Sequence, residues 1–226
     1  MPIVADTFAG FRPEAIQFLA DLAANNERTW FQPRKADYER LLKEPLEALC
    51  TALAERFEAR GIPLRADPAR SPFRIYRDVR FSKDKSPYKT NIGASFPWVG
   101  DGDGAGGYFH LAPGEIFVGG GMWHPEPARL KAFRRLVDAD PSRIHAVIDD
   151  PAFAGMFGTV SGERLSRVPQ GYGADHPDAE LLKLKGVVFM RRLSDGDAAS
   201  PGLPDRLAET IQVGLPLLRL LAALPA

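Results

Sequence analysis

The amino-acid sequence predicts an α+β fold, with one domain in which a mostly antiparallel sheet packs against N-terminal and C-terminal helices. Apolar residues recur at helical spacing near both ends of the chain, and short apolar runs between turn residues fill its middle. The composition, 45% hydrophobic and 26% charged, excludes disordered and collagen-like classes. No linker-like stretch divides the 226 residues, so we expect a single globular domain over 1–226.

Two helical patterns occupy the first sixty residues. The first comprises Phe11, Ala15, Phe18, Leu19 and Leu22, and the second comprises Tyr38, Leu41, Leu42, Leu46, Leu49, Cys50, Leu53 and Phe57. Pro45 lies inside the second pattern, so we expect a kink or a restart there. Gly61 and Pro63 are typical of a helix end.

Strand patterns fall between residues 71 and 123, a stretch that holds 10 of the 22 aromatic residues. Aromatic residues favour strands, and Gly and Pro clusters separate the apolar runs. We expect strands over 73–77, 92–99, 106–112 and 115–122. The glycine-rich loop 100–107 is short, and parallel pairing would need a longer crossover, so the last three strands should be antiparallel neighbours.

Helices resume after residue 126, and prolines mark their starts. Pro127, Pro141 and Pro151 each precede an apolar helical pattern, and an Asp before the last two suits a helix N-cap. A last strand is predicted over 184–192 and a last helix over 203–224, broken near Pro216.

Charge is unevenly distributed along a chain whose formal net charge is zero. Residues 70–90 carry seven basic and two acidic side chains, a local charge of +5. Fixed Arg forks, Lys point charges and nearby hydroxyls are the groups that bind phosphate or carboxylate. We therefore predict a small anionic ligand at this basic, aromatic-rich segment, bound by Arg74, Arg77, Arg80, Lys83, Lys85, Tyr88 and Lys89.

Two alternatives remain open at this stage. Arg77 and Arg80 alternate with apolar residues, so both should be partly buried and held by carboxylates. On this alternative, the segment is a purely structural ion-pair network. Alternatively, the segment docks an acidic protein partner or RNA without catalysis. The balanced overall charge makes nucleic acid the weaker of these partners.

Catalytic signals are weak, and whether the protein is an enzyme stays open. His110 is the one candidate, a strand residue that could act as a general base if it meets a carboxylate. A single histidine on a strand is more often structural. The four histidines lack metal-ligand spacing, and no nucleotide-binding or nucleophile motif occurs, so we expect no metal and no cofactor.

The sequence also bears on location. Cys50 is the single cysteine, so no intramolecular disulfide forms, and the first six residues lack the pattern of a signal peptide. The longest apolar stretch, 215–224, is too short to span a membrane. We expect a cytoplasmic protein without membrane association, and the oligomeric state is not predicted.

Five stretches of the chain resemble a bacterial family known as domain of unknown function 2461. They read FLADLAANNERTWF (18–31), YRDVRFSKDKSPYKT (76–90), GGYFHL (106–111), GGGMW (119–123) and DHPDAELLKLK (175–185). The resemblance extends over about 8–220. It implies signature positions at Asn25, Asn26, Trp30, Arg77, Arg80, Phe81, Lys83, Asp84, Lys85, Tyr88 and Lys89. The family has no established activity, so the resemblance implies no reaction, cofactor or partner.

Overall fold

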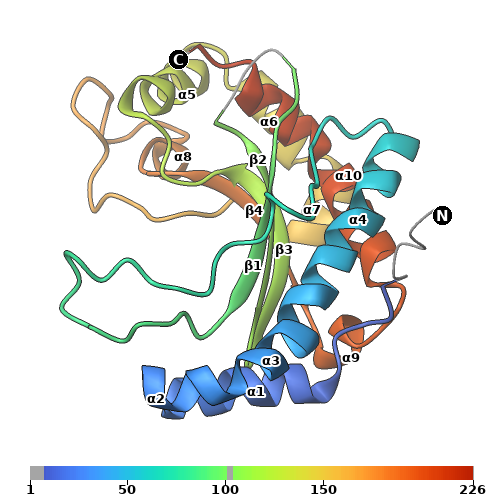
Figure 1. Cartoon of the computed structure of the whole chain (residues 1–226). Coiled ribbons are helices and arrows are strands. Elements are labelled where there is room, and N and C mark those ends of the chain that lie inside the picture. The colour runs from blue at the N-terminus through green and yellow to red at the C-terminus, as the bar shows by residue number, and fades with distance from the viewer. Residues whose placement is uncertain (1–7, 101–103, 226) are drawn as a thin grey trace.

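Four antiparallel strands form the sheet at the centre of the fold, in a computed structural model that describes residues 8–100 and 104–225 (Figure 1). The strands, in the order β1-β2-β3-β4, are β1 (Ile92–Pro97), β2 (Gly106–Ala112), β3 (Glu115–Met122) and β4 (Val187–Leu193). The fold is therefore α+β, as predicted, and the three consecutive strands are antiparallel neighbours. Residues 101–103 of the expected glycine-rich loop and the N-terminal residues 1–7 lie outside the described part.

The two faces of the sheet differ in burial. Along β2, Phe109 and Leu111 are fully buried, whereas Tyr108 and His110 are only partly buried. Successive side chains of a strand point to opposite faces. We call the side of Phe109 the core face and the side of Tyr108 the open face.

Helices cover the core face. In Figure 1, α10 (Leu203–Ala222) and α4 (Glu44–Ala59) lie together on one side of the sheet. Just before α1 (Pro13–Ala24), the ring of Phe11 stacks on Phe109 of β2, with centroids 6.0 Å apart. Gly214 of α10 lies directly against Phe189 of β4, because a Cβ built at that glycine would be 2.1 Å from the ring.

The remaining helical elements, apart from the 13-residue α5, have at most seven residues each. They are α2 (Arg28–Phe31), a 3-10 turn (Gln32–Arg34), α3 (Lys35–Tyr38), a π-helical turn (Glu39–Lys43), α5 (Pro127–Ala139), α6 (Ser142–Ile148), α7 (Pro151–Phe157), α8 (Ala179–Leu182) and α9 (Asp195–Ala198). Near Pro45, where a kink or a restart was expected, α4 begins at Glu44 directly after the π-helical turn. The backbone stays helical across this boundary, so the chain changes helix type there without a break.

Three expectations about individual elements were wrong. Asp140 does not cap α6, because the N-cap position is Pro141 and no side chain caps this helix. Residues 73–77 form no strand; Pro72 and Tyr76 make isolated bridges to Ala94 and Tyr88. The last helix is not broken, because α10 continues through Pro216. Pro216 is exposed, and so is Gln212, whose carbonyl loses its helical donor, so water can satisfy that carbonyl.

Across 8–100 and 104–225, the helices are either too short or too polar to cross a bilayer.

Candidate anion-binding site

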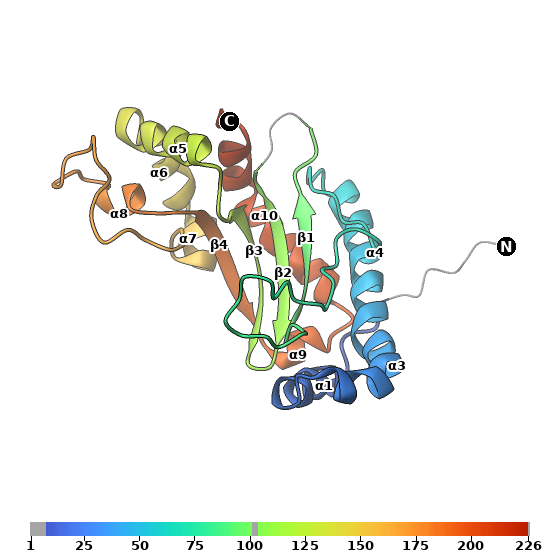
Figure 2. The same cartoon turned by 60° about the vertical axis from the view of Figure 1, so that its left-hand side comes forward.

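Residues 70–90, the basic segment, fold back on themselves beside β1. The backbone N–H of Arg77 donates to Pro87 at 2.9 Å and that of Lys89 to Ile75 at 2.7 Å. A further bond, from Phe73 N–H to Gly93 O at 2.9 Å, joins the segment to β1. Figure 2 shows the segment passing in front of the sheet, on the side away from α10. The basic segment therefore borders the open face.

Asn26, at the exit of α1, holds the returning arm of the basic segment. Its Nδ2 donates to the carbonyl of Tyr88 at 2.9 Å, and the N–H of Tyr88 donates to its Oδ1 at 3.0 Å. The ring of Tyr88 stacks on Phe31 with centroids 4.1 Å apart and is 1% exposed. The structure thus places Tyr88, a predicted ligand residue, in the core, where its ring supports the segment.

Carboxylates of the segment itself engage Arg77 and Arg80. Arg77 pairs with Asp84, whose pKa is lowered by this contact and by two hydrogen bonds from Ser86. Arg80 pairs with Asp78 at 2.7 Å. The side chain of Arg77 is 29% exposed and that of Arg80 is 76% exposed. The expected partial burial is confirmed for Arg77 and wrong for Arg80, because the backbone turns between them.

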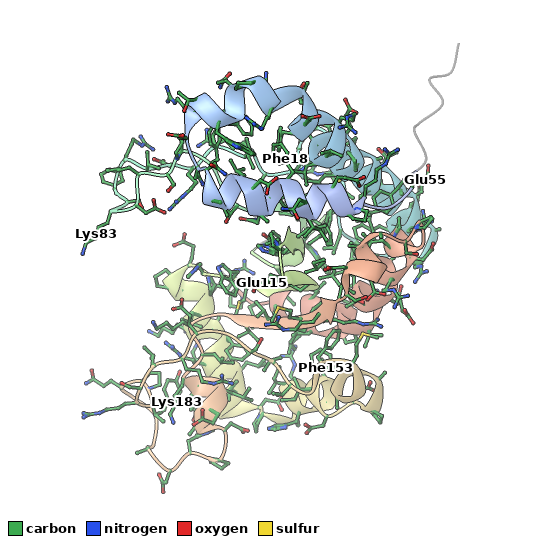
Figure 3. The ribbon with its side chains drawn as sticks, turned by 90° about the horizontal axis from the view of Figure 1, so that it is seen from below. Phe18, Glu55, Lys83, Glu115, Phe153 and Lys183 are labelled. Atoms are coloured by element: carbon green, nitrogen blue, oxygen red, sulfur yellow. The ribbon has the colours of Figure 1, made fainter. Side chains whose placement is uncertain are left out.

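The other basic residues of the segment have different surroundings. Lys85 donates to the carbonyl of Val79 at 3.0 Å, and Lys83 projects away from the molecule in Figure 3. Within residues 8–100 and 104–225, no carboxylate lies at ion-pair distance from Arg74, Lys83 or Lys89. Of these three cations, only Lys89 is partly buried.

Lys89 is in an unfavourable place for a positive charge. Burial lowers its pKa, and the nearby charge of Arg74 lowers the pKa further. The Lys89 Nζ lies 5.1 Å from the centroid of the Phe73 ring, a cation–π contact that offsets part of this cost. Two neighbouring cations, one half-buried, therefore have no carboxylate at ion-pair distance among the described residues, although Asp78 attracts Arg74 from further away.

A pocket of about 320 Å³ lies beside Lys89. Its lining comprises Ala23, Asn26, Arg77, Asp84, Ser86, Tyr88, Lys89, Thr90 and Asn91. The predicted ligand residue Tyr88 therefore borders it, and Arg74 does not. Hydroxyl, amide and cationic donors dominate this lining, with Asp84 as its carboxylate. Donors of this kind suit a small anion that bears several oxygens.

His110 meets a phenol in place of the expected carboxylate. The hydroxyl of Tyr108 lies 3.0 Å from His110 Nδ1, and Nδ2 of Asn91 lies 3.5 Å from the same atom. Burial lowers the pKa of His110, although Glu115 opposes this shift. Both neighbours can donate to Nδ1, so we assign a neutral ring with its proton on Nε2. His110 is therefore suited to donating a hydrogen bond from Nε2.

Gly93 makes the Tyr108–His110 contact possible. A Cβ at this position of β1 would lie 2.6 Å from the Tyr108 hydroxyl. Asn91 both lines the pocket and approaches His110, so the pocket is continuous with this part of the open face. Sequence reasoning missed Asn91 and Tyr108, whose only signal was their closeness in sequence to Lys89 and His110.

Metal and thiol chemistry find no support in the described part of the chain. No group of three potential metal ligands gathers within residues 8–100 and 104–225. Cys50 is fully buried in α4, and burial raises the pKa of its thiol to about 12. A thiol in this state is a poor nucleophile.

Comparison with known proteins gave one match. Neither the curated proteins nor the solved structures include a significant relative of this chain. The model of one protein family, described as "Conserved hypothetical protein (DUF2461)", matches residues 14–219. This match includes all four strands and the whole basic segment. The chain therefore belongs to the DUF2461 family of conserved hypothetical proteins.

Proposed function

We propose that the protein binds a phosphate- or carboxylate-bearing small molecule between Arg74 and Lys89, at the mouth of the adjoining pocket. The observation that supports this is the pairing of two like charges, one half-buried, with no carboxylate at ion-pair distance among the described residues. Burying an uncompensated charge is costly. A bound anion would offset the repulsion from Arg74 and raise the pKa of Lys89.

The neighbouring residues have supporting roles in this proposal. Arg77, joined to Asp84, shapes the wall of the pocket, and its guanidinium retains donors for a ligand oxygen. Thr90 and Asn91 supply neutral donors. The exposed cations Arg80, Lys83 and Lys85 raise the local potential and would speed the approach of an anion. No reaction is assigned, and a cytoplasmic location remains part of the proposal.

Binding is tested with inorganic phosphate and succinate by isothermal titration calorimetry at an ionic strength of about 0.15 M, where long-range attraction is screened. Replacing Arg74 or Lys89 by Met should weaken binding of the better ligand about tenfold each, since a charge-assisted hydrogen bond contributes about 1.5–3 kcal/mol. Lys131→Met and Arg135→Met, on exposed positions of α5, remove the same charges elsewhere and should leave affinity unchanged. Equal affinity in all four variants, or no binding by the wild-type protein, would refute the proposal.

A second candidate function rests on the tip of the basic segment. The ring of Phe81 is 96% exposed, beside the exposed Arg80 and Lys83. An exposed aromatic residue flanked by cations suits an acidic surface of a protein partner. Binding of poly-glutamate that Phe81→Ser weakens, while phosphate affinity stays the same, would favour this function.

A further inference from the structure

The open face of the sheet has an unusual composition. A sheet face directed to water normally carries polar side chains. Here the open-face positions of the first three strands are mainly rings and small residues, namely Gly93 and Ser95 on β1, Gly106, Tyr108 and His110 on β2, and Phe117, Gly119 and Gly121 on β3. Because such a surface is poorly hydrated, it is suited to contact with an apolar, flat group.

Four rings are in contact with one another there, and we call them the aromatic layer: Phe73, Tyr108, His110 and Phe117. Phe73 and Tyr108 have centroids 6.0 Å apart with 45° between their planes, and Tyr108 and Phe117 have centroids 5.8 Å apart with 58° between their planes. His110 and Phe117 stack at 4.8 Å with only 9° between their planes. Phe73 is 45% exposed and the other three are partly buried, so the layer stays accessible.

Glycines keep this layer uncovered. Gly93 is the cross-strand neighbour of His110, and Gly119 is the neighbour of Tyr108. Opposed side chains of antiparallel strands normally touch, but His110 on the β1 side and Tyr108 on the β3 side each face a position without a side chain. A Cβ at Gly119 would lie 2.2 Å from the carbonyl oxygen of Phe189, so the backbone itself requires glycine at that position.

Cations flank the aromatic layer on two sides. Lys89 lies over the ring of Phe73, at the border with the anion site. Arg192 of β4 is exposed and stands opposite Phe117 in the register of the sheet. Glu115, at the start of β3, is the acidic group that acts on His110 and Tyr108. The surface therefore combines rings with positive charge, next to the pocket.

We propose that the ligand of the Arg74–Lys89 site is an aromatic anion, whose ring stacks on the aromatic layer while its phosphate or carboxylate contacts the two cations. This inference rests on the proposed function. Stacked rings and cationic flanks would suit a single-stranded nucleic acid as well. Such a polymer needs a long basic surface, but the net charge of this chain is zero. The carboxylates of Asp84, in the pocket, and Glu115, near His110, also add negative charge here, so we favour a small molecule.

The test compares phenyl phosphate with cyclohexyl phosphate, which has the same charge and a similar size but no aromatic ring. We expect phenyl phosphate to bind about three- to tenfold more tightly. Phe117→Leu should remove most of this difference and leave the affinity for inorganic phosphate unchanged. Phe81→Leu, which replaces an exposed ring outside the aromatic layer, should preserve the difference.

Proton NMR of His110 gives a direct readout, with its signals identified by their loss in His110→Gln. Phenyl phosphate should shift these signals through the ring current, and cyclohexyl phosphate should not. Equal affinities with no ring-current shift would overturn the inference, while binding of inorganic phosphate would still support the anion site. Tighter, Phe117-dependent binding of a ten-nucleotide single strand, with no preference for phenyl phosphate, would assign the face to nucleic acid and also overturn it.

Discussion

Asn26 and Tyr88 are joined by two hydrogen bonds through which one side-chain amide satisfies both backbone groups of the tyrosine. The amide takes the place of a neighbouring strand, because it bonds both the N–H and the carbonyl of one residue. It also connects the exit of α1 to the basic segment. The same contact fixes the position of Lys89, the next residue along the chain, so a contact in the wall of the pocket determines where the cation of the proposed site lies.

Replacing Asn26 with Ala should lower the free energy of unfolding by about 2–3 kcal/mol, because both backbone groups of Tyr88 lose their partner at a largely buried position. Urea denaturation measures the change. Asn25→Ala is the matched control, since it removes a single exposed bond to the carbonyl of Asp21. An equal decrease in the free energy of unfolding in the two variants would show that the Asn26 contact contributes no more than an exposed hydrogen bond.

Two glycine positions in helices should respond in opposite ways to alanine. Gly214→Ala brings a Cβ to 2.1 Å from the ring of Phe189 and should cost about 1–3 kcal/mol of stability. Gly155→Ala, in α7, meets nothing within 4 Å and should add about 0.5–1 kcal/mol by reducing the entropy of the unfolded chain. Urea midpoints of the two variants check the prediction. A stable Gly214→Ala protein would contradict the close contact between α10 and β4.

His145 should stabilise the fold at acidic pH. Its ring lies 2.8 Å from Asp178 and 2.9 Å from Asp149, and hydrogen bonds to these carboxylates, Asp178 first, raise its pKa above 6.5. The charged form is therefore favoured in the folded state. This contribution is complete below about pH 6.5 and disappears as the pH rises through the folded-state pKa.

The measurement is the difference in unfolding free energy between wild type and His145→Gln at a series of pH values. The variant should be less stable at pH 5 and should approach the wild type at pH 9. His124→Asn, which removes an exposed imidazole, controls for loss of a histidine. A difference that stays constant with pH would contradict the ion pairs.

His110 should have the opposite effect. Burial, the largest influence, lowers its pKa below 6.5 in the folded state, so the unfolded chain takes up the proton first as the pH falls. The protein then loses stability as the pH drops below about 6.5, until the folded-state pKa is passed. His110→Gln should flatten this part of the stability profile, and an unchanged profile would show that His110 titrates normally.

Much of the fold follows from local rules, and these parts were predicted. Asp150 caps α7 as expected, because its carboxylate accepts from the N–H groups of Ala152 and Phe153. The connections between β1, β2 and β3 are too short for parallel crossovers, so the lengths of these connections predicted the antiparallel pairing. The basic segment was likewise visible as a run of charge in the sequence.

Local rules could not predict which side of a helix is buried or which groups surround each cation. Pro216 stays inside α10 because it falls on the solvent side, which local propensity does not reveal. Arg80 appeared to alternate with apolar residues, yet the turn at Asp78 exposes it. Arg74 and Lys89 looked no different from the other basic residues.

The sequence by itself determined the α+β class, most element positions and the location of the positive charge. Only the tertiary structure decided which cations lack a carboxylate partner, which face of the sheet stays open, and that Asn26 holds Tyr88. The physical reason is the separation in sequence of the residues that interact. Periodicity, capping and turn formation depend on residues a few positions apart, whereas desolvation and ion pairing depend on every group that folding brings near, including one 62 residues away.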